Sequence, residues 1–434
     1  MVIEKLYELY LQHPVISTDT RKIASGSLFF ALKGDKFDAN TFATQALEAG
    51  AAYAVIDNAQ YRISDQYILV DDVLQTLQDL AKYHRKQVQI PVIGLTGSNG
   101  KTTTKELINS VLSQHFNTYA TQGNLNNHIG VPLSVLSINP SHEVAVIEMG
   151  ANHQREIAML CEIAQPTHGL ITNVGKAHLE GFGGPEGVKK GKGELYDYLK
   201  ATGGVIFINT DSPKLVDMKA ERELQNTIGY GTQAEGNFIW GKLTNNSPYV
   251  ALEWYDENGN AHAVQSNLTG AYNIDNILVA ICIGAFLKLS TAEINAGIED
   301  YQPVNNRSQI KHTETNVLIC DYYNANPSSM AVAIDNISIM DAKTKVLILG
   351  DMFEMGEVSP TEHEAIIQKA ILAPVDERIF IGKHFYEQRL GFSADFYETA
   401  EDAIKAIKDK PIKNATILIK GSRGMALERL VELL

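Results

Sequence analysis

The chain contains little cysteine and no long apolar run. Cys161, Cys282 and Cys320 stand far apart, so they predict neither a disulfide framework nor a zinc cluster. No stretch approaches the ~18 consecutive apolar residues of a membrane span. The N-terminal segment MVIEKLYELYLQHPVIS has an early acid and lacks the apolar core of a signal peptide. These absences predict a protein of the reducing cytoplasm that does not contact a membrane.

Basic residues are also in deficit. The 37 lysines and arginines face 51 aspartates and glutamates, which gives a formal net charge of -14. Non-specific binding to nucleic acid depends on neutralising many phosphates with Lys and Arg, so we expect no nucleic-acid partner. An anionic ligand must instead be held by local features such as a helix N-terminus, a single basic side chain or a metal ion.

The length of 434 residues exceeds what one compact core usually holds and predicts two to four domains. The polar, basic stretch Lys82 to Gln89 indicates a boundary near residue 87. A new α/β pattern begins after the segment Pro303-Val304-Asn305-Asn306-Arg307. We therefore predict domains at residues 1–87, 88–306 and 307–434.

Short apolar runs alternate with helical stretches along the chain, which predicts an α/β fold. The N-terminal part is a small α/β module with a helix at 43–52 that ends at Gly50. The central part predicts a mostly parallel sheet with helices on both faces, and the C-terminal part predicts a doubly wound domain. Residues 238–254 predict a hairpin-like insertion, with a turn at 256–260. The other predicted strands lie at residues 28–32, 144–147, 169–173, 205–209, 317–320, 346–349, 379–381 and 417–419.

The most informative stretch is PVIGLTGSNGKTTTKE, residues 91–106. Residues 91–95 predict a short buried strand, and residues 105–116 have the apolar spacing of a helix. Glycines in the loop between them allow a tight turn with inward-facing N–H groups, and the helix N-terminus adds positive potential. Lys101 supplies a mobile cation for phosphates, and Thr102 or Thr103 supplies a hydroxyl for Mg²⁺. The loop predicts an ATP site formed by Gly97, Ser98, Asn99, Gly100, Lys101, Thr102 and Thr103.

The match to the general nucleotide-binding pattern is incomplete, because Leu95 occupies the place of its first glycine. An ordinary glycine-rich turn into a helix is the alternative. The succession of strand, glycines, Lys-Thr pair and helix favours nucleotide binding. The sequence has no Asn-Lys-x-Asp guanine motif, so we do not expect a GTPase.

Polar residues follow the predicted strands, at the edge where ligands gather in α/β sheets. Glu148 directly follows the strand at 144–147 and places a carboxylate where Mg²⁺ beside the phosphate loop needs an oxygen ligand. A carboxylate that caps the next helix is the alternative. His178 lies in a glycine-rich loop after the next strand, although a lone histidine is more often structural.

Two further segments are rich in asparagine. The loop Gly123 to Pro132 holds Asn124, Asn126 and Asn127 densely enough to favour substrate or phosphate contacts over simple solvation. Asn273 and Asn276 stand one helical turn apart, where their carboxamides could read a base edge. Helix capping is the alternative for Asn273.

Two charged segments have equally plain alternatives. Gly187 to Leu195 predicts a basic turn entering a helix, which taken alone is a solvated charge cluster. The polar turn Ser17-Thr18-Asp19-Thr20-Arg21 could hold an anionic group or could simply face water.

With these segments in place, the chain resembles the Mur ligases over its whole length. The resemblance rests on motifs that follow one order, namely Thr18-Asp19-Thr20-Arg21 with LFFALKG, then TGSNGKTTTKE, GNLNNHIGVPLSVL, IEMGANH, NVGKAHLEGFGG, DYYNANPSSM, LGDMFEMGE and KGSRGM. Single motifs are weak, whereas the set in register is very specific. Within the family, the chain is similar to the ligases that add D-alanyl-D-alanine to UDP-N-acetylmuramoyl tripeptide. The Asp-Asn-Pro-Arg motif of the ligase that adds the third residue is absent.

The resemblance implies a UDP-sugar-binding domain, a central ATPase domain and a Rossmann-like C-terminal domain that contacts ATP and the incoming amino component. It implies an ATP-dependent ligase of peptidoglycan precursor synthesis, and hence a role in cell-wall biogenesis, cell shape and cell division. The implied cofactors are ATP and Mg²⁺, and the implied partners are the small molecules UDP-N-acetylmuramoyl tripeptide and D-alanyl-D-alanine. We expect a monomer.

The resemblance also implies residue roles. Lys101 would hold the phosphates, Thr102 and Glu148 one Mg²⁺, and Glu148 and His178 a second. A lysine at the position of Lys192 is often carbamylated in the family and would face the metal, with Lys189 and Lys190 as alternatives in register. The implied nucleotide contacts are Asn273 and Asn276 to adenine, Arg307 to the phosphates and Asp321 to the ribose. The implied substrate contacts are Ser17, Thr18, Asp19, Thr20, Arg21, Asn124, Asn126, Asn127, Asn324 and Asn326.

The sequence departs from the family pattern at two places. Tyr272 stands where relatives usually have His, and Cys320 and Tyr322 replace the usual Asp and Ser around Asp321. These departures bear on the adenine and ribose contacts and not on the metal site. The alternative functions are another Mur-type ligase or a folylpolyglutamate synthetase and, from a different class, a phosphotransferase or a regulatory ATPase.

Overall fold

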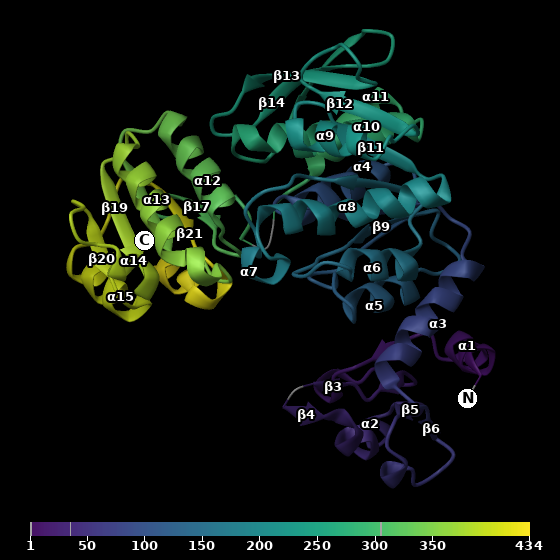
Figure 1. Cartoon of the computed structure of the whole chain (residues 1–434). Coiled ribbons are helices and arrows are strands. Elements are labelled where there is room, and N and C mark those ends of the chain that lie inside the picture. The colour runs from purple at the N-terminus through teal and green to yellow at the C-terminus, as the bar shows by residue number, and fades with distance from the viewer. Residues whose placement is uncertain (1, 35, 304–305) are drawn as a thin grey trace.

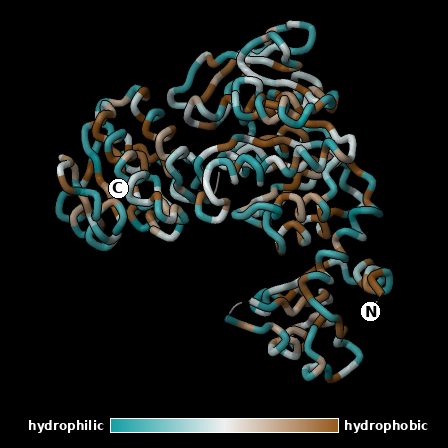
Figure 2. Tube along the Cα trace, in the orientation of Figure 1, coloured by the Kyte–Doolittle hydropathy of each residue, from teal (hydrophilic) through white to brown (hydrophobic). Residues whose placement is uncertain are grey.

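The computed structural model describes residues 2–34, 36–303 and 306–434, which form three lobes that each contain a largely parallel sheet (Figure 1). Apolar segments run through the strands and the inner sides of the helices, whereas most connecting loops are hydrophilic (Figure 2). The α/β class predicted from the sequence is therefore confirmed. No helix formed by the described residues is both long and apolar enough to cross a bilayer. Cys161, Cys282 and Cys320 are free and buried.

The N-terminal lobe has a four-stranded parallel sheet in the order β1-β2-β5-β6. Its strands are β1 (Ile16–Ser17), β2 (Leu28–Phe30), β5 (Tyr53–Ile56) and β6 (Tyr67–Leu69). Helix α2 (Ala43–Glu48) packs on one face, and α1 (Ile3–Gln12) and α3 (Val73–Gln87) pack on the other. The short strands β3 (Lys33–Gly34) and β4 (Phe37–Asp38) form a separate hairpin.

Helix α3 connects the N-terminal lobe to the central lobe. Leu77 and Leu80 of this helix belong to the same buried cluster as Val135 of α5 (Gly130–Leu136) and Leu160 of α6 (Glu156–Ala164). The first lobe is thus attached through a buried apolar contact as well as through the chain. The predicted domain boundary near residue 87 coincides with the end of α3 and stays a prediction.

The central lobe is built on a nine-stranded sheet in the order β15-β14-β13-β12-β11-β10-β7-β9-β8. Its strands are β7 (Val92–Thr96), β8 (Thr118–Ala120), β9 (Val144–Glu148), β10 (His168–Ile171), β11 (Val205–Asn209), β12 (Thr227–Gly231), β13 (Ile239–Asn245), β14 (Ala251–Tyr255) and β15 (Ala261–Gln265). All pairs from β8 to β13 are parallel, and the last two pairs are antiparallel.

Helices cover both faces of the central sheet because its inner strands are apolar on both sides. In β7, Val92 faces one buried cluster, whereas Ile93 and Leu95 face the other, as the two-residue period of a strand requires. The helices on the first face are α5, α6, α8 (Pro185–Thr202) and α9 (Pro213–Glu221). Those on the second face are α4 (Lys101–Leu112), α10 (Ile274–Phe286) and α11 (Thr291–Asp300).

The C-terminal lobe has a six-stranded sheet in the order β16-β17-β21-β18-β19-β20, in which only the β16–β17 pair is antiparallel. Its strands are β16 (Gln309–His312), β17 (Val317–Asp321), β18 (Lys345–Gly350), β19 (Glu377–Ile381), β20 (Asp395–Tyr397) and β21 (Thr416–Lys420). Helices α12 (Pro327–Ile339) and α13 (Ser359–Leu372) cover one face, and α15 (Ala400–Asp409) lies on the other. The predicted doubly wound domain is confirmed.

Three sequence predictions differ from the structure. Helix α4 begins at Lys101 rather than at residue 105, because Gly100 caps it in a left-handed conformation, φ 77°, and Lys101 to Thr104 form its first turn. The predicted hairpin at 238–254 exists as β13–β14, but β13 also pairs with β12 and so extends the central sheet. The turn predicted at 256–260 joins β14 to β15.

The third difference concerns the basic segment 187–195, which lies inside α8 and is not a turn. Its glycines are close-approach positions within a helix. A Cβ on Gly187 would stand 1.8 Å from the Phe182 carbonyl oxygen, and one on Gly191 would stand 2.5 Å from the Phe182 ring. Glycine there permits close packing, which the sequence pattern alone does not separate from a turn signal.

Candidate active site

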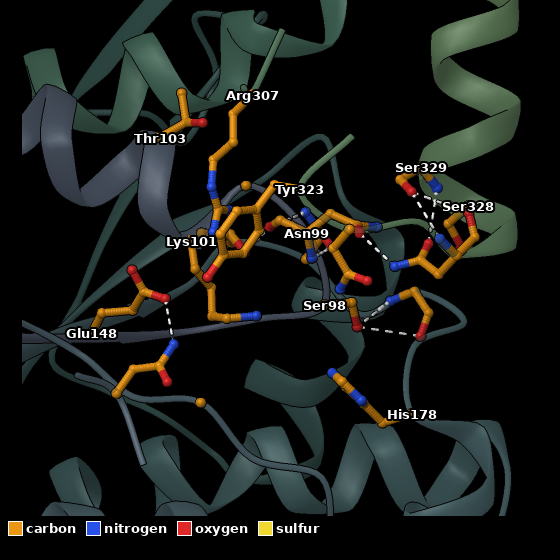
Figure 3. A pocket seen from close by; sticks show the side chains of 18 of the residues that line it. Ser98, Asn99, Lys101, Thr103, Glu148, His178, Arg307, Tyr323, Ser328 and Ser329 are labelled. Carbon is orange, nitrogen blue, oxygen red and sulfur yellow. Dashed lines mark hydrogen bonds between the residues drawn. The ribbon is translucent and has the colours of Figure 1, made fainter. Parts of the chain in front are cut away.

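A cavity of about 920 Å³ lies between the central and C-terminal lobes. The central lobe contributes the loops that follow β7, β9 and β10, and the C-terminal lobe contributes the loops that follow β17 and β18. Figure 3 shows side chains from both lobes around the phosphate loop, with Ser328 and Ser329 of α12 on one side and Glu148 on the other. Parallel strands place their carboxyl ends together, so the two sheets present their binding edges to the same space.

The phosphate loop, residues 97–100, requires glycine at both ends. Gly97 has φ 152°, and a Cβ there would stand 1.9 Å from Thr172 Oγ1. Gly100 has φ 77°, and a Cβ there would meet Asn276 Oδ1 at 2.9 Å. The loop is therefore packed between the loop after β10 and the start of α10.

Two of the loop N–H groups do not face the cavity as the sequence suggested. Ser98 N–H donates to Asn173 O at 3.0 Å, and Asn99 N–H donates to Asn173 Oδ1 at 3.0 Å. The first N–H groups of α4, from Lys101 to Thr103, lack partners within the helix and remain available for an anion. The N-terminus of α4 therefore offers more free N–H donors to an anion than the loop before it does.

Lys101 lies at the centre of the cavity and donates from Nζ to Gly97 O at 2.7 Å (Figure 3). Burial lowers the pKa of Lys101, and the nearby Glu148 carboxylate opposes that effect. A buried cation is costly unless it is paired, so an anion in this cavity would be bound with little competition from water. Lys105 lies one turn along α4 and donates to Thr121 O at 2.7 Å.

Glu148 is held rigidly at the end of β9. Its side chain accepts from Thr102 Oγ1 at 3.0 Å and from Asn126 Nδ2 at 2.8 Å, and the residue is only 1% exposed. The helix-capping alternative does not apply, because these two partners lie on α4 and on the loop after β8. The carboxylate and the threonine hydroxyl converge beside the N-terminus of α4.

His178 makes its contact with the other lobe. Its Nδ1 bonds to a carboxylate oxygen of Glu354, in the loop after β18. Burial lowers the pKa of His178, and the adjacent Glu354 carboxylate raises it in part. In the part of the chain that the structure describes, no group of three or more His, Cys, Asp and Glu side chains is arranged to hold a metal ion.

Lys192 is the only one of the three candidate lysines that is buried. It is 1% exposed, donates from Nζ to Ala151 O at 3.2 Å and lies 5.1 Å from the centre of the Phe182 ring. Burial, followed by the charge of Lys101, holds the pKa of Lys192 well below its usual range. Lys190 is exposed, and Lys189 pairs with Glu221 away from the cavity.

The predicted nucleotide contacts line the cavity. Asn276 accepts from Thr104 Oγ1 at 2.9 Å and donates to Asn273 Oδ1 at 2.8 Å. Asn273 stands at the N-cap of α10, but its side chain donates to Thr269 O and does not cap the helix. The two carboxamides therefore bond to each other and form a fixed polar wall.

Arg307 and Asp321 lie on the C-terminal side of this wall. The Arg307 guanidinium stacks on the Tyr323 ring at 3.9 Å, and its buried Nε has no hydrogen-bond partner among the described residues. Asp321 pairs with Lys420 Nζ at 2.6 Å. The neighbouring residues Val304 and Asn305 lie outside the described residues.

The predicted substrate residues fall into two groups. Asn124, Asn126, Asn127, Asn324 and Asn326 line the cavity. Asn127 also caps α5 through the N–H groups of Ile129 and Gly130, and Asn326 caps α12 and donates to Asn99 Oδ1 at 2.7 Å. Residues 17–21 lie in the N-terminal lobe, away from this cavity, where Arg21 pairs with Asp19 at 2.7 Å.

Comparison with known proteins places the chain in a family. Sequence models match residues 95–284 (Mur ligase middle domain), 306–423 (Mur ligase, glutamate ligase domain) and 14–85 (Mur ligase family, catalytic domain). A relative from Bacillus subtilis (strain 168), named UDP-N-acetylmuramoyl-tripeptide--D-alanyl-D-alanine ligase, is 34% identical across 98% of this chain and 94% of its own length. The chain belongs to the Mur ligase family.

Solved structures agree with this Mur ligase assignment. MurF from Acinetobacter baumannii has a TM-score of 0.87 at 31% identity, covering 96% of this chain and 92% of that one. MurF from Thermotoga maritima in complex with ADP has a TM-score of 0.84 at 27% identity, covering 96% of both chains. The three-domain fold expected from the sequence resemblance is confirmed.

Sequence reasoning missed the residues that join the two lobes of this Mur ligase at the cavity. Glu354 bonds to His178, and Lys176 pairs with Glu362 at 2.6 Å. Asn173 fixes the phosphate loop, whereas its sequence context indicates only the end of a strand. Glu354 lies in the LGDMFEMGE motif, so its motif was visible, but no spacing rule connects it to a residue 176 positions earlier.

Proposed function

We propose that this chain is an ATP-dependent ligase that joins D-alanyl-D-alanine to UDP-N-acetylmuramoyl tripeptide during peptidoglycan precursor synthesis. The observation that carries the proposal is the end-to-end similarity to ligases of that name, at 34% identity over 98% of the chain. The similarity to an ADP-bound MurF structure supports the use of ATP.

The chemistry requires activation of a carboxyl group. A free carboxylate is a poor acceptor for an amine, because the leaving group would be oxide. Transfer of the γ-phosphoryl group of ATP to the terminal carboxylate of the tripeptide gives an acyl phosphate and ADP. The neutral amine of D-alanyl-D-alanine then attacks the acyl carbon. The C–O bond to phosphate breaks, and one amine proton leaves with the departing phosphate as the amide forms.

The residues of the cavity fit these steps. The N-terminus of α4 and Lys101 hold the phosphates and stabilise the charge that develops during transfer. Arg307 contributes a guanidinium whose Nε has no described partner, as expected of a residue that meets an anion. Asn273, Asn276 and Asp321 contact the adenine and ribose. Closure of the two lobes around three substrates aligns the reacting groups and excludes water.

Thr102 and Glu148 provide oxygen donors of the kind that Mg²⁺ prefers, and they meet beside the phosphate site at 3.0 Å. These two side chains fit Mg²⁺ and would hold it. When bound, this ion would neutralise phosphate charge. The second ion that the resemblance implies, at Glu148 and His178 with Lys192 facing it, does not fit the side chains as they stand, because the Lys192 amine donates to the Ala151 carbonyl oxygen.

Carbamylation of Lys192 would convert that side chain into a carboxylate. The reaction with carbon dioxide needs a neutral amine, and burial lowers the pKa of Lys192 in the required direction. Burial and the Ala151 contact favour Lys192 over the exposed Lys190 as the modified residue.

The three proposed domains have distinct roles. Residues 1–87 bind the UDP-sugar, with residues 17–21 in contact with the nucleotide part. Residues 88–306 bind ATP, and residues 307–434 bring the amino component, with Asn324 and Asn326 near the substrates. The enzyme acts in the cytoplasm as a monomer, where its substrates are small molecules.

The test is ADP release by the purified chain with ATP, Mg²⁺ and UDP-N-acetylmuramoyl tripeptide, with and without D-alanyl-D-alanine. The proposal predicts rapid ADP release and a lengthened peptide only when the dipeptide is present. Stimulation by a third-residue amino acid or by glutamate would instead indicate another ligase of this superfamily. A phosphorylated stable product would indicate a kinase, and ADP release without any amine would indicate a regulatory ATPase.

A further inference from the structure

Five carboxylate side chains line the cavity among the described residues, and Glu354 is the one of these five that bonds to a side chain of the other lobe. Glu148 is bound by Thr102 and Asn126, as described above. Glu156 accepts from the N–H groups of Asn152 and His153. Asp321 pairs with Lys420, and Asp275 is half-buried in the first turn of α10. The remaining carboxylate is Glu354.

Glu354 reaches the cavity from the C-terminal lobe. Its side chain is 60% exposed, and its described partner is His178 of the central lobe. Both residues have left-handed backbones, with φ 60° at Glu354 and φ 52° at His178. Such conformations are uncommon for residues other than glycine and cost free energy, so they persist where the surrounding structure imposes them, often at functional sites.

The basic side chains that line the cavity leave Glu354 without a cationic Lys or Arg partner in the described structure. Lys420 pairs with Asp321, Lys214 donates to Val174 O at 2.9 Å, and Lys101 donates to Gly97 O. His178 lies below Ser98 in Figure 3, with its ring directed toward Lys101. Glu354, bound to His178, is therefore a carboxylate at the side of the cavity where the acyl phosphate would form.

We propose that Glu354 binds the amino group of the incoming D-alanyl-D-alanine. The inference rests on the proposed function, because that function supplies the amine. A dipeptide arrives with an ammonium group, and a carboxylate is its natural partner in a charge-assisted hydrogen bond. Glu354 belongs to the C-terminal lobe, and His178 of the central lobe fixes the Glu354 carboxylate beside the phosphate site. The bound amine would therefore lie close to the acyl phosphate.

The competing explanation for the Glu354–His178 contact is that it only stabilises the association of the two lobes. The Lys176–Glu362 pair, at 2.6 Å, is a second ionic contact between the same two lobes, and Lys176 also donates its N–H to Ser328 Oγ at 3.0 Å. Glu362→Gln therefore serves as a matched control, because it breaks a contact between the lobes without touching the carboxylate proposed for the amine.

The experiment measures binding rather than turnover. The enzyme is saturated with a non-hydrolysable ATP analogue, Mg²⁺ and UDP-N-acetylmuramoyl tripeptide, and calorimetry gives Kd for D-alanyl-D-alanine and for its N-acetyl derivative, which has no ammonium group. The wild-type chain is expected to prefer the free amine by roughly 10-fold or more, as a charged hydrogen bond would give. Glu354→Gln and Glu354→Ala should lose most of this preference and leave binding of the acetylated dipeptide unchanged.

Glu362→Gln should keep the preference, even if it weakens both ligands. An unchanged preference in both Glu354 variants would overturn the proposal, as would an equal loss of both ligands in the Glu354 and Glu362 variants. If the wild-type chain bound neither dipeptide and released no ADP in its presence, the proposed function would fail together with this inference. If the wild-type chain made the lengthened peptide and both Glu354 variants kept its preference for the free amine, the proposed function would stand and the assignment of Glu354 would fall.

Discussion

Glu148 ends β9 and His178 lies in the loop after β10, and these two strands flank the strand that leads into the phosphate loop, yet the two side chains are held in opposite ways. Glu148 is 1% exposed and bonded by two side chains of its own lobe. His178 bonds to Glu354 of the C-terminal lobe. One half of the site is therefore fixed within the central lobe, and the other half depends on contact between lobes.

The difference has a physical reason. A buried carboxylate must be satisfied by hydrogen bonds wherever the lobes stand, because an unpaired buried charge is very costly. A partly exposed imidazole can exchange its partner for water at little cost. We expect substitutions in the first half to remove the reaction and substitutions in the second half to act mainly through substrate binding and lobe contact.

The largest effect should follow from removal of Glu148 or Lys101. Glu148→Ala leaves Thr102 and Asn126 without their shared acceptor and removes the proposed Mg²⁺ ligand, and Lys101→Ala removes the central cation. Each should lower kcat/KM by roughly 1,000-fold or more, as loss of charge stabilisation in a closed site commonly does. Quantification of the lengthened peptide by mass spectrometry checks this. Near-normal turnover in either variant, with an unchanged circular dichroism spectrum, would remove the site assignment.

Lys192→Ala should cause a loss of about 100-fold, because the proposed carbamate supplies a single carboxylate. Short carboxylates such as acetate or formate should restore part of the activity, since they can occupy the vacated space. Lys190→Ala is the control and should behave as wild type, because that side chain is exposed. A complete absence of rescue at every carboxylate concentration would argue against the modification.

A moderate effect should follow from loss of the Asn99–Asn326 contact, which ties the phosphate loop to the C-terminal lobe at 2.7 Å. Asn326→Ala should raise KM for ATP by about 5-fold, with a smaller change in kcat, as expected for one hydrogen bond between uncharged groups. The double variant Asn99→Ala/Asn326→Ala should raise KM for ATP by no more than the single variant with the larger effect. Strict additivity of the two losses would show that the two side chains do not act together.

The smallest effect concerns stability at the edge of the cavity. Burial, followed by repulsion from Asp211, raises the pKa of Asp275 from 3.8 to about 6. The folded chain then keeps a proton that the unfolded chain has lost, so the contribution of Asp275 to stability is present below pH 4 and is lost as the pH rises through 6. The free energy of unfolding of Asp275→Asn minus that of wild type should therefore increase by about 1 kcal/mol when the pH rises from 5 to 8.

Urea unfolding at the two pH values measures this difference. Asp217→Asn, on the exposed side of α9, is the control and should show no such pH dependence. A constant difference between Asp275→Asn and wild type across the range would contradict the raised pKa.

Local patterns in the sequence were sufficient for most of the fold. The apolar runs at residues 144–147 and 91–95 predicted β9 and β7 closely, because both faces of these strands are buried. Gly187 and Gly191 led to the wrong prediction of a turn, because glycine is typical both of turns and of close contacts to a helix.

The sequence predicts the half of the site that lies within the central lobe better than the half that depends on contact between lobes. Lys101 follows β7, and Glu148 ends β9 of the same sheet, so the rule that parallel strands place their carboxyl ends together predicts that the two residues lie close to each other. Glu354, Glu362 and Asn326 belong to the C-terminal lobe, and no local sequence pattern shows how two lobes meet. The commitment of the Ser98 and Asn99 N–H groups to Asn173 likewise depends on tertiary contacts alone.

The most direct test of the account is the fate of oxygen in the tripeptide carboxylate. The purified chain is given ATP, Mg²⁺, D-alanyl-D-alanine and UDP-N-acetylmuramoyl tripeptide whose terminal carboxylate carries ¹⁸O at both oxygens, and the released phosphate is analysed by mass spectrometry. If the γ-phosphoryl group activates that carboxylate, each phosphate should carry one ¹⁸O atom when a lengthened peptide forms. Phosphate without label, or label retained entirely in the peptide, would contradict the account.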